Sequence, residues 1–488
     1  MTDVDTVTDT TEAELDGLLN AAVAAAPVLA ATRPSARAGW LRAVADALDA
    51  DAERLIPLAA EESHLGVPRL TGELKRTTFQ LRLFADVLDE GAYLQVTIDH
   101  ADPTWGMGPR PDLRRMLRPL GPVAIWAASN FPFAFSVAGG DTASALAAGT
   151  PVLLKAHPGH PRLSVATGDI VVKALRDAGA PDGTFALVTG VEIGRALITD
   201  PRIAAGAFTG SLKGGRALFD LASSRPAPIP FYGELGSVNP SVVTPSAAAA
   251  RAEEVASGFA DSMTLGVGQF CTKPGLLFVP AGSALPALVA TRLAAVAGAP
   301  MLNESIARGY SGALGELASH EGVSVVAGGE GGDAPAPSLL TTSAAEFLKD
   351  PETLTHEAFG PAALVIEYAD TAELQRAIGV IDGQLTATVQ AVDDDPDAAA
   401  VLPLLAERAG RVLVNGWPTG VSVTWAMQHG GPYPATTSVQ TTSVGTAAID
   451  RFLRPVSYQG TPDALLPEPL RESNPWSLPR RVDGVQER

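Results

Sequence analysis

The sequence predicts an α/β protein in which parallel sheets are covered by helices on both faces. Between residues 120 and 240, short apolar runs bounded by Gly and Pro alternate with stretches of helical periodicity, and the alternation resumes after residue 238. Strands that are apolar at every position are typical of parallel sheets with both faces buried. A chain of 488 residues also exceeds one hydrophobic core, so we expect two or three domains.

The expected elements follow the chain. Residues 11–60 and 71–90 repeat apolar side chains at helical spacing and predict covering helices without chemistry of their own. In the first α/β series we expect strands at 123–128, 152–154, 185–189, 203–209 and 229–235, with helices at 136–148, 163–178, 193–199 and 214–222. In the second series we expect a helix at 247–264 and strands at 276–279, 323–326, 363–368, 386–392 and 412–415. The Gly/Pro-rich stretch 328–337 and the tail from residue 465 predict irregular structure.

The composition excludes several kinds of partner and site. A formal charge of −19 argues against nucleic acid or an anionic membrane as a partner. A single cysteine excludes an intramolecular disulfide and a Cys-rich metal site, and we expect no metal ion. The N-terminus is acidic, and the apolar run 21–30 contains Pro27 and is too short to span a bilayer. We therefore expect a cytoplasmic protein.

Polar residues stand where four strands of the first series end. Asn130 follows the first strand and Lys155 ends the second. The fourth strand ends in Phe208–Ser211, with Thr209, and the fifth in Gly233–Gly236, with Glu234. In parallel sheets ligands bind beyond the carboxyl ends of the strands. The four positions together predict a ligand site at this edge.

Cys271 is the one cysteine of the chain, in a loop with glycines at 266 and 268. Glycine lets the backbone approach a substrate closely, and a thiol in such a loop is a candidate nucleophile. A lone cysteine can also be a small buried hydrophobic residue, so the loop by itself leaves both interpretations open.

Six motifs in this order resemble the NAD(P)-dependent aldehyde dehydrogenase superfamily. They are Asn130–Pro132, Lys155, Phe208–Ser211, Glu234–Gly236, Gly268–Cys271 and Glu357–Pro361, and the resemblance runs from about residue 10 to 460. The residues around Gly140 and the run from His429 to Ala435 are similar to the branch that oxidises 2-oxoglutarate semialdehyde, and to related bacterial fatty-aldehyde dehydrogenases. The resemblance implies two doubly wound Rossmann-like α/β domains and a small β arm for oligomerisation.

The resemblance also implies the catalytic roles. Addition of the Cys271 thiolate to an aldehyde gives a tetrahedral adduct that can release hydride to nicotinamide, leaving a thioester. The Asn130 amide and the Cys271 backbone N–H would stabilise the oxyanion, and Glu234 would activate the water that hydrolyses the thioester. Asn130 stands too far before the helix expected at 136 to be its usual N-cap.

A dinucleotide would bind at the strand ends. Gly210 and Ser211 lie between a strand and a helix, where backbone N–H groups can meet pyrophosphate, although this is not the G-x-G-x-x-G fingerprint. Lys155 would contact the adenosine ribose or its 2′-phosphate, and Glu357 would hold the nicotinamide ribose with Phe359 beside the ring. The full cofactor set is Ser129, Lys155, His157, Thr209, Gly210, Ser211, Gly215, Leu235, Glu357 and Phe359. Pro158 stands where NAD-specific relatives often carry glutamate, so we expect NADP to be preferred over NAD.

The substrate is less closely defined. Phe131, Phe135 and Trp425 are candidate substrate walls or core residues, and His429 is either close to Cys271 or structural. The leading substrate is 2-oxoglutarate semialdehyde; a long-chain aliphatic aldehyde is the alternative, and a cationic pocket or an apolar tunnel would distinguish them. CoA-dependent release of the thioester and a catalytically silent binding protein of this fold are further alternatives, against which Glu234, Cys271 and Asn130 together argue.

The domains are assigned from these expectations. Residues 1–110 and 121–237 would form the dinucleotide-binding domain and 238–430 the catalytic domain. Residues 111–120 and 431–450, with strands near 113–120 and 436–444, would form the arm of a homodimer or homotetramer, and 451–488 a C-terminal tail.

Overall fold

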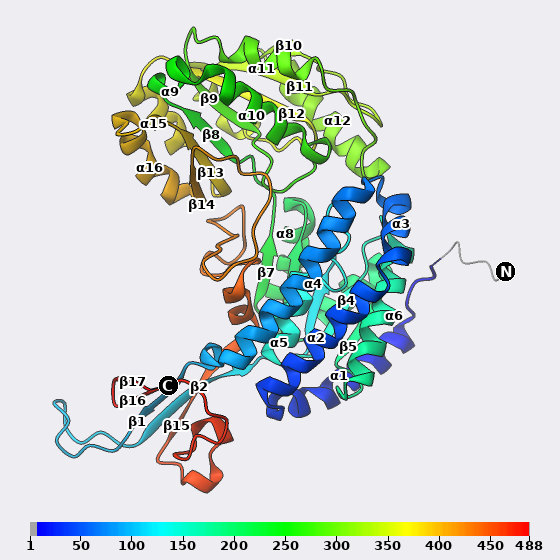
Figure 1. Ribbon diagram of the computed structural model, residues 1–488, viewed down its shortest axis with the longest axis vertical. Helices are drawn as coiled ribbons and strands as arrows, with labels where there is room; N and C mark the ends of the chain where they lie inside the picture. Colours follow the sequence, from blue (N-terminus) through cyan, green and yellow to red (C-terminus); the bar gives the residue numbers. More distant parts are fainter. Residues whose placement is uncertain (1–6, 488) are drawn as a thin grey trace.

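The computed structural model describes residues 7–487. Figure 1 shows two lobes, each built on one sheet, and a third sheet that projects from the lower lobe. The segment between β14 and η3 (orange) passes between the two lobes.

The lower lobe contains a parallel sheet of five strands in the order β5-β4-β3-β6-β7. The strands are β3 (Val123–Trp126), β4 (Val152–Lys155), β5 (Phe185–Val188), β6 (Ala205–Thr209) and β7 (Phe231–Glu234). All five strands expected in the first series are confirmed, and each overlaps a short apolar run between turn residues.

Helices cover both faces of this sheet. One face packs on α2 (Pro34–Ala50), α4 (Val67–Glu90), α5 (Gly140–Ala148) and α6 (Pro161–Asp177), and the other on α1 (Glu12–Ala31), α7 (Val191–Thr199) and α8 (Leu212–Ser223). Side chains alternate between the faces, so Ile125 joins the first core and Trp126 the second. The short helix α3 (Ala52–Ser63) contacts α4 and α6.

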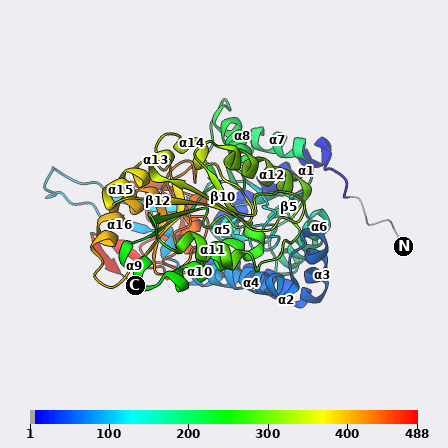
Figure 2. The same ribbon diagram turned by 90° about the horizontal axis from the view of Figure 1, so that it is seen from above.

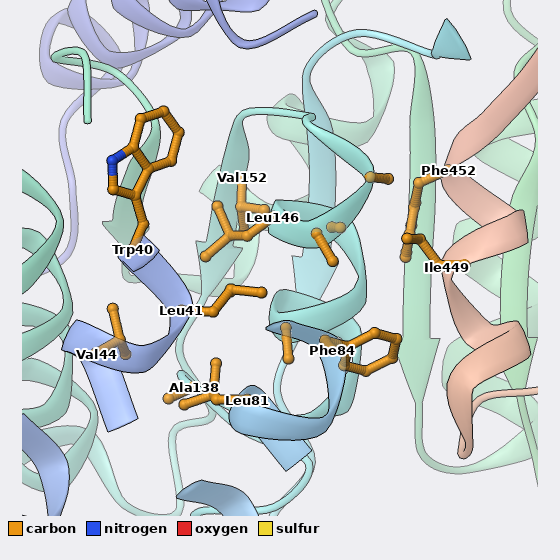
Figure 3. Packing of buried hydrophobic residues seen from close by; sticks show 14 of the residues in the cluster. Trp40, Leu41, Val44, Leu81, Phe84, Ala138, Leu146, Val152, Ile449 and Phe452 are labelled. Carbon is orange, nitrogen blue, oxygen red and sulfur yellow. The ribbon is translucent and has the colours of Figure 1, made fainter. Parts of the chain in front are cut away.

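Helix α5 lies at the centre of the first core. Figure 3 shows Leu41 of α2 and Leu146 of α5 close together, while Ile449 and Phe452 of η3 (Thr446–Phe452) face α5 from the other side. The helix begins four residues later than the sequence predicts, because residues 132–139 fold as turns and bends. Gly139, not Asn130, is its N-cap, so Asn130 is free of that structural role.

Helix α1 is the one helix among the described residues that is long and apolar enough to cross a membrane. It continues through Pro27 and is therefore longer than the apolar run recognised in the sequence. Leu15, Leu19 and Ala22 are buried in the core over the second face of the sheet. In this structure α1 is a covering helix of the lower lobe.

The upper lobe contains seven strands in the order β10-β11-β12-β9-β8-β13-β14, parallel except for β10. They are β8 (Pro240–Val243), β9 (Leu276–Pro280), β10 (Ser324–Ala327), β11 (Ser338–Ser343), β12 (Ala362–Tyr368), β13 (Gln384–Gln390) and β14 (Ala409–Val414). The five strands expected here are confirmed, whereas β8 and β11 were not expected, since Pro, Ser and Thr interrupt their apolar residues.

The upper sheet is also covered on both faces, as Figure 2 shows from above. One face carries α9 (Pro245–Ala250), α10 (Ala252–Thr264) and α11 (Leu285–Leu293). The other carries α12 (Glu304–Ser319), α13 (Ala344–Phe347), α14 (Pro351–Leu354), α15 (Thr371–Gly379) and α16 (Pro396–Arg408). The single helix expected at 247–264 is two helices, which separate at Arg251.

The projecting sheet corrects the predicted arm. Its order is β15-β2-β1-β16-β17, from β1 (Val96–Asp99), β2 (Leu113–Pro119), β15 (Leu453–Gln459), β16 (Arg480–Val482) and β17 (Val485–Glu487). The partner of β2 is β15 and not residues 436–444, which form turns and one isolated bridge between Thr436 and Glu234. The tail after residue 465 is likewise ordered, because β16 pairs with β1. Strands β1, β16 and β17 are too short to show periodicity, and β15 mixes polar residues with a proline, so the sequence did not reveal these four.

Candidate active site

The polar strand ends of the lower sheet meet at one edge. The strand register sets Trp126 beside Lys155 and Phe208, and Thr209 beside Glu234. Since the strands are parallel, all their carboxyl ends share that edge. The ligand site predicted from the sequence therefore has a geometric basis.

Cys271 lies in a loop with a constrained backbone. The three residues Gly266, Val267 and Gly268 of η2 (Leu265–Gly268) all have left-handed conformations, with φ of 58°, 59° and 66°. A Cβ at Gly268 would lie 2.3 Å from the carbonyl oxygen of Gly360. The loop thus packs directly on the Glu357–Pro361 segment, which only glycine at 268 permits.

Residues after Cys271 are held by two buried side chains. Nδ2 of Asn239 donates to the carbonyl oxygens of Cys271 at 2.8 Å and Lys273 at 2.9 Å. Nζ of Lys273 donates to the carbonyls of Ala358 and Ala362 at 3.1 and 2.8 Å. Burial lowers the pKa of Lys273 to about 8. The sequence did not single out either residue; a signal for Lys273 was its place in the turn after Cys271.

The central cluster joins Cys271, His429 and Glu234. Nε2 of His429 lies 3.6 Å from Sγ of Cys271 and 3.0 Å from Oε1 of Glu234, and the Ser443 hydroxyl donates to Oε2 of Glu234. His429 and Glu234 are buried, whereas Cys271 is partly accessible. Nε2 can carry one proton, so at any moment it can donate a hydrogen bond either to the sulfur or to the carboxylate. Ser443 was missed because it is 209 residues from its partner.

The cluster lowers the pKa of Glu234 and raises the pKa of Cys271. Burial alone would raise the pKa of Glu234, but the His429 imidazole, the Ser443 hydroxyl and Cys271 together hold it below its usual value. Burial and then the negative charge of Glu234 raise the pKa of Cys271 well above the usual value of a thiol. The arrangement therefore favours an ionised carboxylate next to a protonated thiol, with the carboxylate as proton acceptor.

Asn130 reaches the cysteine loop from the other lobe. Its Nδ2 donates to the carbonyl oxygen of Gln269 at 3.1 Å, two residues before Cys271. Its own carbonyl oxygen accepts from Nη2 of Arg69 at 2.6 Å. The structure thus brings Asn130, Glu234, Cys271 and His429 together.

Two of the three predicted aromatic walls belong to this cluster. The Phe131 ring lies 5.2 Å from the rings of both Phe135 and Phe270, and the Phe135 ring lies 6.5 Å from His429. Phe131 and Phe135 are half-buried. Trp425 does not join them: its side chain is 56% exposed, and it makes no ring contact within residues 7–487.

The residues at the sheet edge fit a dinucleotide. Oγ1 of Thr209 is buried and has no hydrogen-bond partner within the described chain. Ser211 caps α8 by accepting from the Gly214 N–H, so the other N–H groups of the first turn remain available to an anion. A Cβ at Gly215 would lie 2.1 Å from Cδ2 of Leu235, so the helix packs closely on the strand end.

The remaining predicted cofactor residues surround this edge. Lys155 is buried at the end of β4, and burial lowers its pKa. The His157 ring lies 5.6 Å from that of His160, and burial lowers the pKa of His157 to about 3. Ser129 and Gly210 follow β3 and β6, the former half-buried and the latter exposed.

Glu357 belongs to the cysteine side of the site. A Cβ at Gly236 would lie 2.5 Å from its Oε2, which places Glu357 over the residue that follows Leu235. Burial raises the pKa of Glu357 to about 7, against the opposing charge of Lys273. Phe359 is half-buried two residues further along.

Comparison with known proteins identifies the family. The aldehyde dehydrogenase family model matches residues 2–455. Alpha-ketoglutaric semialdehyde dehydrogenase 2 of Azospirillum brasilense is 48% identical over 93% of this chain and 88% of its own length. Alpha-ketoglutaric semialdehyde dehydrogenase of Acinetobacter baylyi is 44% identical over the same shares.

Solved structures share the fold. NADP-dependent glyceraldehyde-3-phosphate dehydrogenase of Bacillus halodurans, complexed with NADP, is similar with a TM-score of 0.78 and 22% identity, over 93% of this chain and 92% of that one. An aldehyde dehydrogenase of Physcomitrella patens gives the same TM-score and identity over 93% and 91%. The chain therefore belongs to the aldehyde dehydrogenase family and is an NAD(P)-dependent aldehyde dehydrogenase.

Proposed function

We propose that this protein oxidises 2-oxoglutarate semialdehyde to 2-oxoglutarate with NADP, through a thioester on Cys271. The observation that carries the mechanism is one nitrogen, Nε2 of His429, within reach of both the Cys271 sulfur and the Glu234 carboxylate. The substrate is taken from the names of two relatives at 48% and 44% identity.

The first step is addition of sulfur to the aldehyde carbon. The thiol proton moves to Glu234, which releases it to solvent before hydrolysis, and the thiolate bonds to the carbonyl carbon. Negative charge then develops on the former carbonyl oxygen. The Asn130 amide and the Cys271 N–H are the proposed donors to it, since Asn130 already reaches the loop at Gln269.

The second step restores the free thiol. The residues at the sheet edge, Lys155, Thr209 and Ser211 among them, would hold a nicotinamide dinucleotide, which would supply the hydride acceptor; loss of hydride from the adduct carbon leaves an acyl thioester on Cys271. Glu234, ionised and held by His429 and Ser443, takes a proton from water as that water attacks the thioester. A base of this kind favours hydrolysis over transfer of the acyl group to CoA.

The preference for NADP rests on charge at the end of β4. Lys155 is the proposed partner of the 2′-phosphate, and Pro158 leaves the nearby turn without the carboxylate that would repel a phosphate. Turnover with NADP and NAD at equal concentration tests this preference. A preference for NAD of about tenfold or more contradicts it.

A homodimer, or a tetramer of such dimers, is proposed from the projecting sheet. Its β1–β2 loop reaches furthest from the body in Figure 1 and exposes Trp105 at 49% and Met107 at 96%. Apolar side chains this exposed favour a partner surface. Light scattering tests the assembly: the double variant Trp105→Ser, Met107→Ser should weaken it, and a monomeric wild type contradicts it.

The single cysteine and the charge of −19 support a cytoplasmic location.

The reaction itself is tested with a panel of aldehydes. Wild type should reduce NADP with 2,5-dioxopentanoate as the preferred substrate, and Cys271→Ala should lower kcat/KM by about a thousandfold or more. Equal activity of Cys271→Ala would reject the mechanism. A wild type that prefers long aliphatic aldehydes would reject the substrate and favour the fatty-aldehyde alternative.

A further inference from the structure

Two arginines of α4 lie on the aromatic side chains that surround the reacting thiol, and the mechanism above uses neither. Arg69 and Arg76 lie seven residues apart, two turns of one helix, and so share a face with Glu73 between them. This face packs on the loop after Asn130, because Oε1 of Glu73 accepts from the N–H groups of Phe133 at 2.8 Å and Ala134 at 3.0 Å.

Arg69 lies against the cysteine loop. Its guanidinium carbon is 4.6 Å from the ring centre of Phe270, the neighbour of Cys271, and 5.1 Å from that of Phe131. A Cβ at Gly266 would be 2.6 Å from Nη1 of Arg69. Nη2 donates to the Asn130 carbonyl, whereas Nε and Nη1 are buried without a hydrogen-bond partner in the described chain.

Arg76 lies over the second aromatic wall. Its guanidinium carbon is 5.2 Å from the ring centre of Phe135, which itself contacts His429. Nη1 is buried and has no partner within residues 7–487. The charges that act on Arg76 are those of Glu73, Cys271 and Glu234, so the guanidinium is within electrostatic reach of the thiol.

The charge of this face is not balanced. On this face of α4 two guanidinium groups face one carboxylate, that of Glu73; its Oε1 accepts from two backbone N–H groups, and its Oε2 has no hydrogen-bond partner in the described chain, so one acceptor stands against three unpaired guanidinium nitrogens. Burying the N–H groups of a guanidinium without hydrogen-bond acceptors costs free energy, unless a ligand supplies those acceptors. A carboxylate does so with two oxygens, in the planar geometry that guanidinium recognises.

We propose that Arg69 and Arg76 form the receptor for the carboxylate of the aldehyde substrate, which makes short ω-oxo acids the preferred class. The proposal rests on the function proposed above and names the residues that select the substrate. Four carbon–carbon bonds of about 1.5 Å separate the aldehyde and carboxylate carbons of 2,5-dioxopentanoate, a span of roughly 5 Å. The half-buried rings of Phe131 and Phe135 would flank the carbon chain between the two ends.

The same receptor disfavours a long aliphatic aldehyde. An alkyl tail would cover the guanidinium donors and provide no acceptor for them, and a site that lacks its polar partner rejects the analogue strongly. Arg411 does not offer an equal alternative, since two of its nitrogens already donate to the carbonyls of Pro418 and Gly420.

The test compares 5-oxopentanoate and 2,5-dioxopentanoate with pentanal. Arg76→Gln and Arg69→Gln should lower kcat/KM for the two acids by about 30- to 1,000-fold, mainly through KM. Arg76→Gln should change kcat/KM for pentanal by less than about threefold, whereas Arg69→Gln, which also loses the bond to the Asn130 carbonyl, should lower it for pentanal by a smaller factor than for the acids. Arg76→Lys and Arg69→Lys retain the charge opposite Glu73 and should give intermediate values, which guards against misfolded variants. Arg82→Gln is the matched control on α4, because Arg82 pairs with Asp46 and Asp49 at the surface.

A second measurement needs no turnover. 2-Oxoglutarate should protect Cys271 of wild type and of Arg82→Gln from iodoacetamide, and the protection should be lost in Arg69→Gln and Arg76→Gln. Equal losses for the acids and pentanal, or protection that survives in both Gln variants, would overturn the receptor. If wild type does not oxidise 2,5-dioxopentanoate but protection still depends on the arginines, the proposed substrate is wrong and the receptor stands.

Discussion

Nε2 of His429 lies 3.0 Å from Oε1 of Glu234, and both side chains are buried. The pair joins the last irregular segment of the upper lobe to the end of β7 in the lower sheet. It therefore fixes the position of the carboxylate in relation to the Cys271 sulfur, which lies 3.6 Å from the same nitrogen.

Replacing His429 should move the pH dependence of thioester hydrolysis. His429 is the largest influence that opposes burial in lowering the pKa of Glu234, so His429→Asn should raise that pKa. A base with a raised pKa is ionised only at higher pH, and the acid limb of kcat should move upward. We expect about a hundredfold lower kcat at neutral pH, recovered in part in alkaline buffer. Steady-state assays across pH measure both; an unmoved acid limb would show that His429 does not tune Glu234.

Ser443→Ala should also raise the pKa of Glu234, by a smaller amount than His429→Asn. The Ser443 hydroxyl also lowers the pKa of Glu234, but it contributes less than His429. The acid limb should therefore move in the same direction by a smaller amount. A control is Ser438→Ala in the same segment, since Ser438 makes no hydrogen bond to Glu234 in the described chain. Identical profiles for the two serine variants would contradict the assignment.

The thiol of the free enzyme should react slowly at neutral pH. Because burial and Glu234 raise the pKa of Cys271, the rate of alkylation by iodoacetamide should still be rising at pH 9. Glu234→Gln removes the neighbouring negative charge, lowers the thiol pKa and should speed alkylation at pH 8, by about tenfold for each unit of pKa. A rate that levels off near pH 7 in wild type, or falls in Glu234→Gln, would refute this electrostatic account.

Gly268→Ala should destabilise the protein and lower its activity. The substitution forces a φ of 66° on alanine and brings Cβ to 2.3 Å from the Gly360 carbonyl oxygen. We expect a cost of about 1–3 kcal/mol in the free energy of unfolding. Gly315→Ala in α12 is the control, because its Cβ would meet no atom within 4 Å, and helix propensity predicts a gain of about 0.5–1 kcal/mol. Denaturant unfolding measures both, and equal stability of the two variants would contradict the packing of the loop.

The sequence predicted the fold where local signals were strong. The strands from β3 to β7 were found because each overlaps a short apolar run bounded by Gly or Pro, whereas polar residues or Pro interrupt β1, β8 and β11. The arm was assigned to the wrong partner strand, since the pairing of β2 with β15 joins residues more than 330 positions apart. Short-range patterns do not report contacts over that separation.

Only part of the active site could likewise be predicted from the sequence. Cys271, Glu234 and Asn130 stood out because they lie in motifs at strand ends and in a glycine loop. Arg69 and Arg76 did not, since they belong to an ordinary amphipathic helix and become significant only when α4 packs beside Phe131 and Phe270. Ser443 likewise acquires its role through folding.

The most direct test of the central claim is to trap the acyl enzyme. Glu234→Gln mixed with 2,5-dioxopentanoate and NADP should release one equivalent of NADPH per subunit in a burst. Mass spectrometry of the quenched protein should find the 2-oxoglutaryl group on the peptide that carries Cys271. Undiminished turnover by Glu234→Gln, or a burst with Cys271 unmodified, would contradict the account.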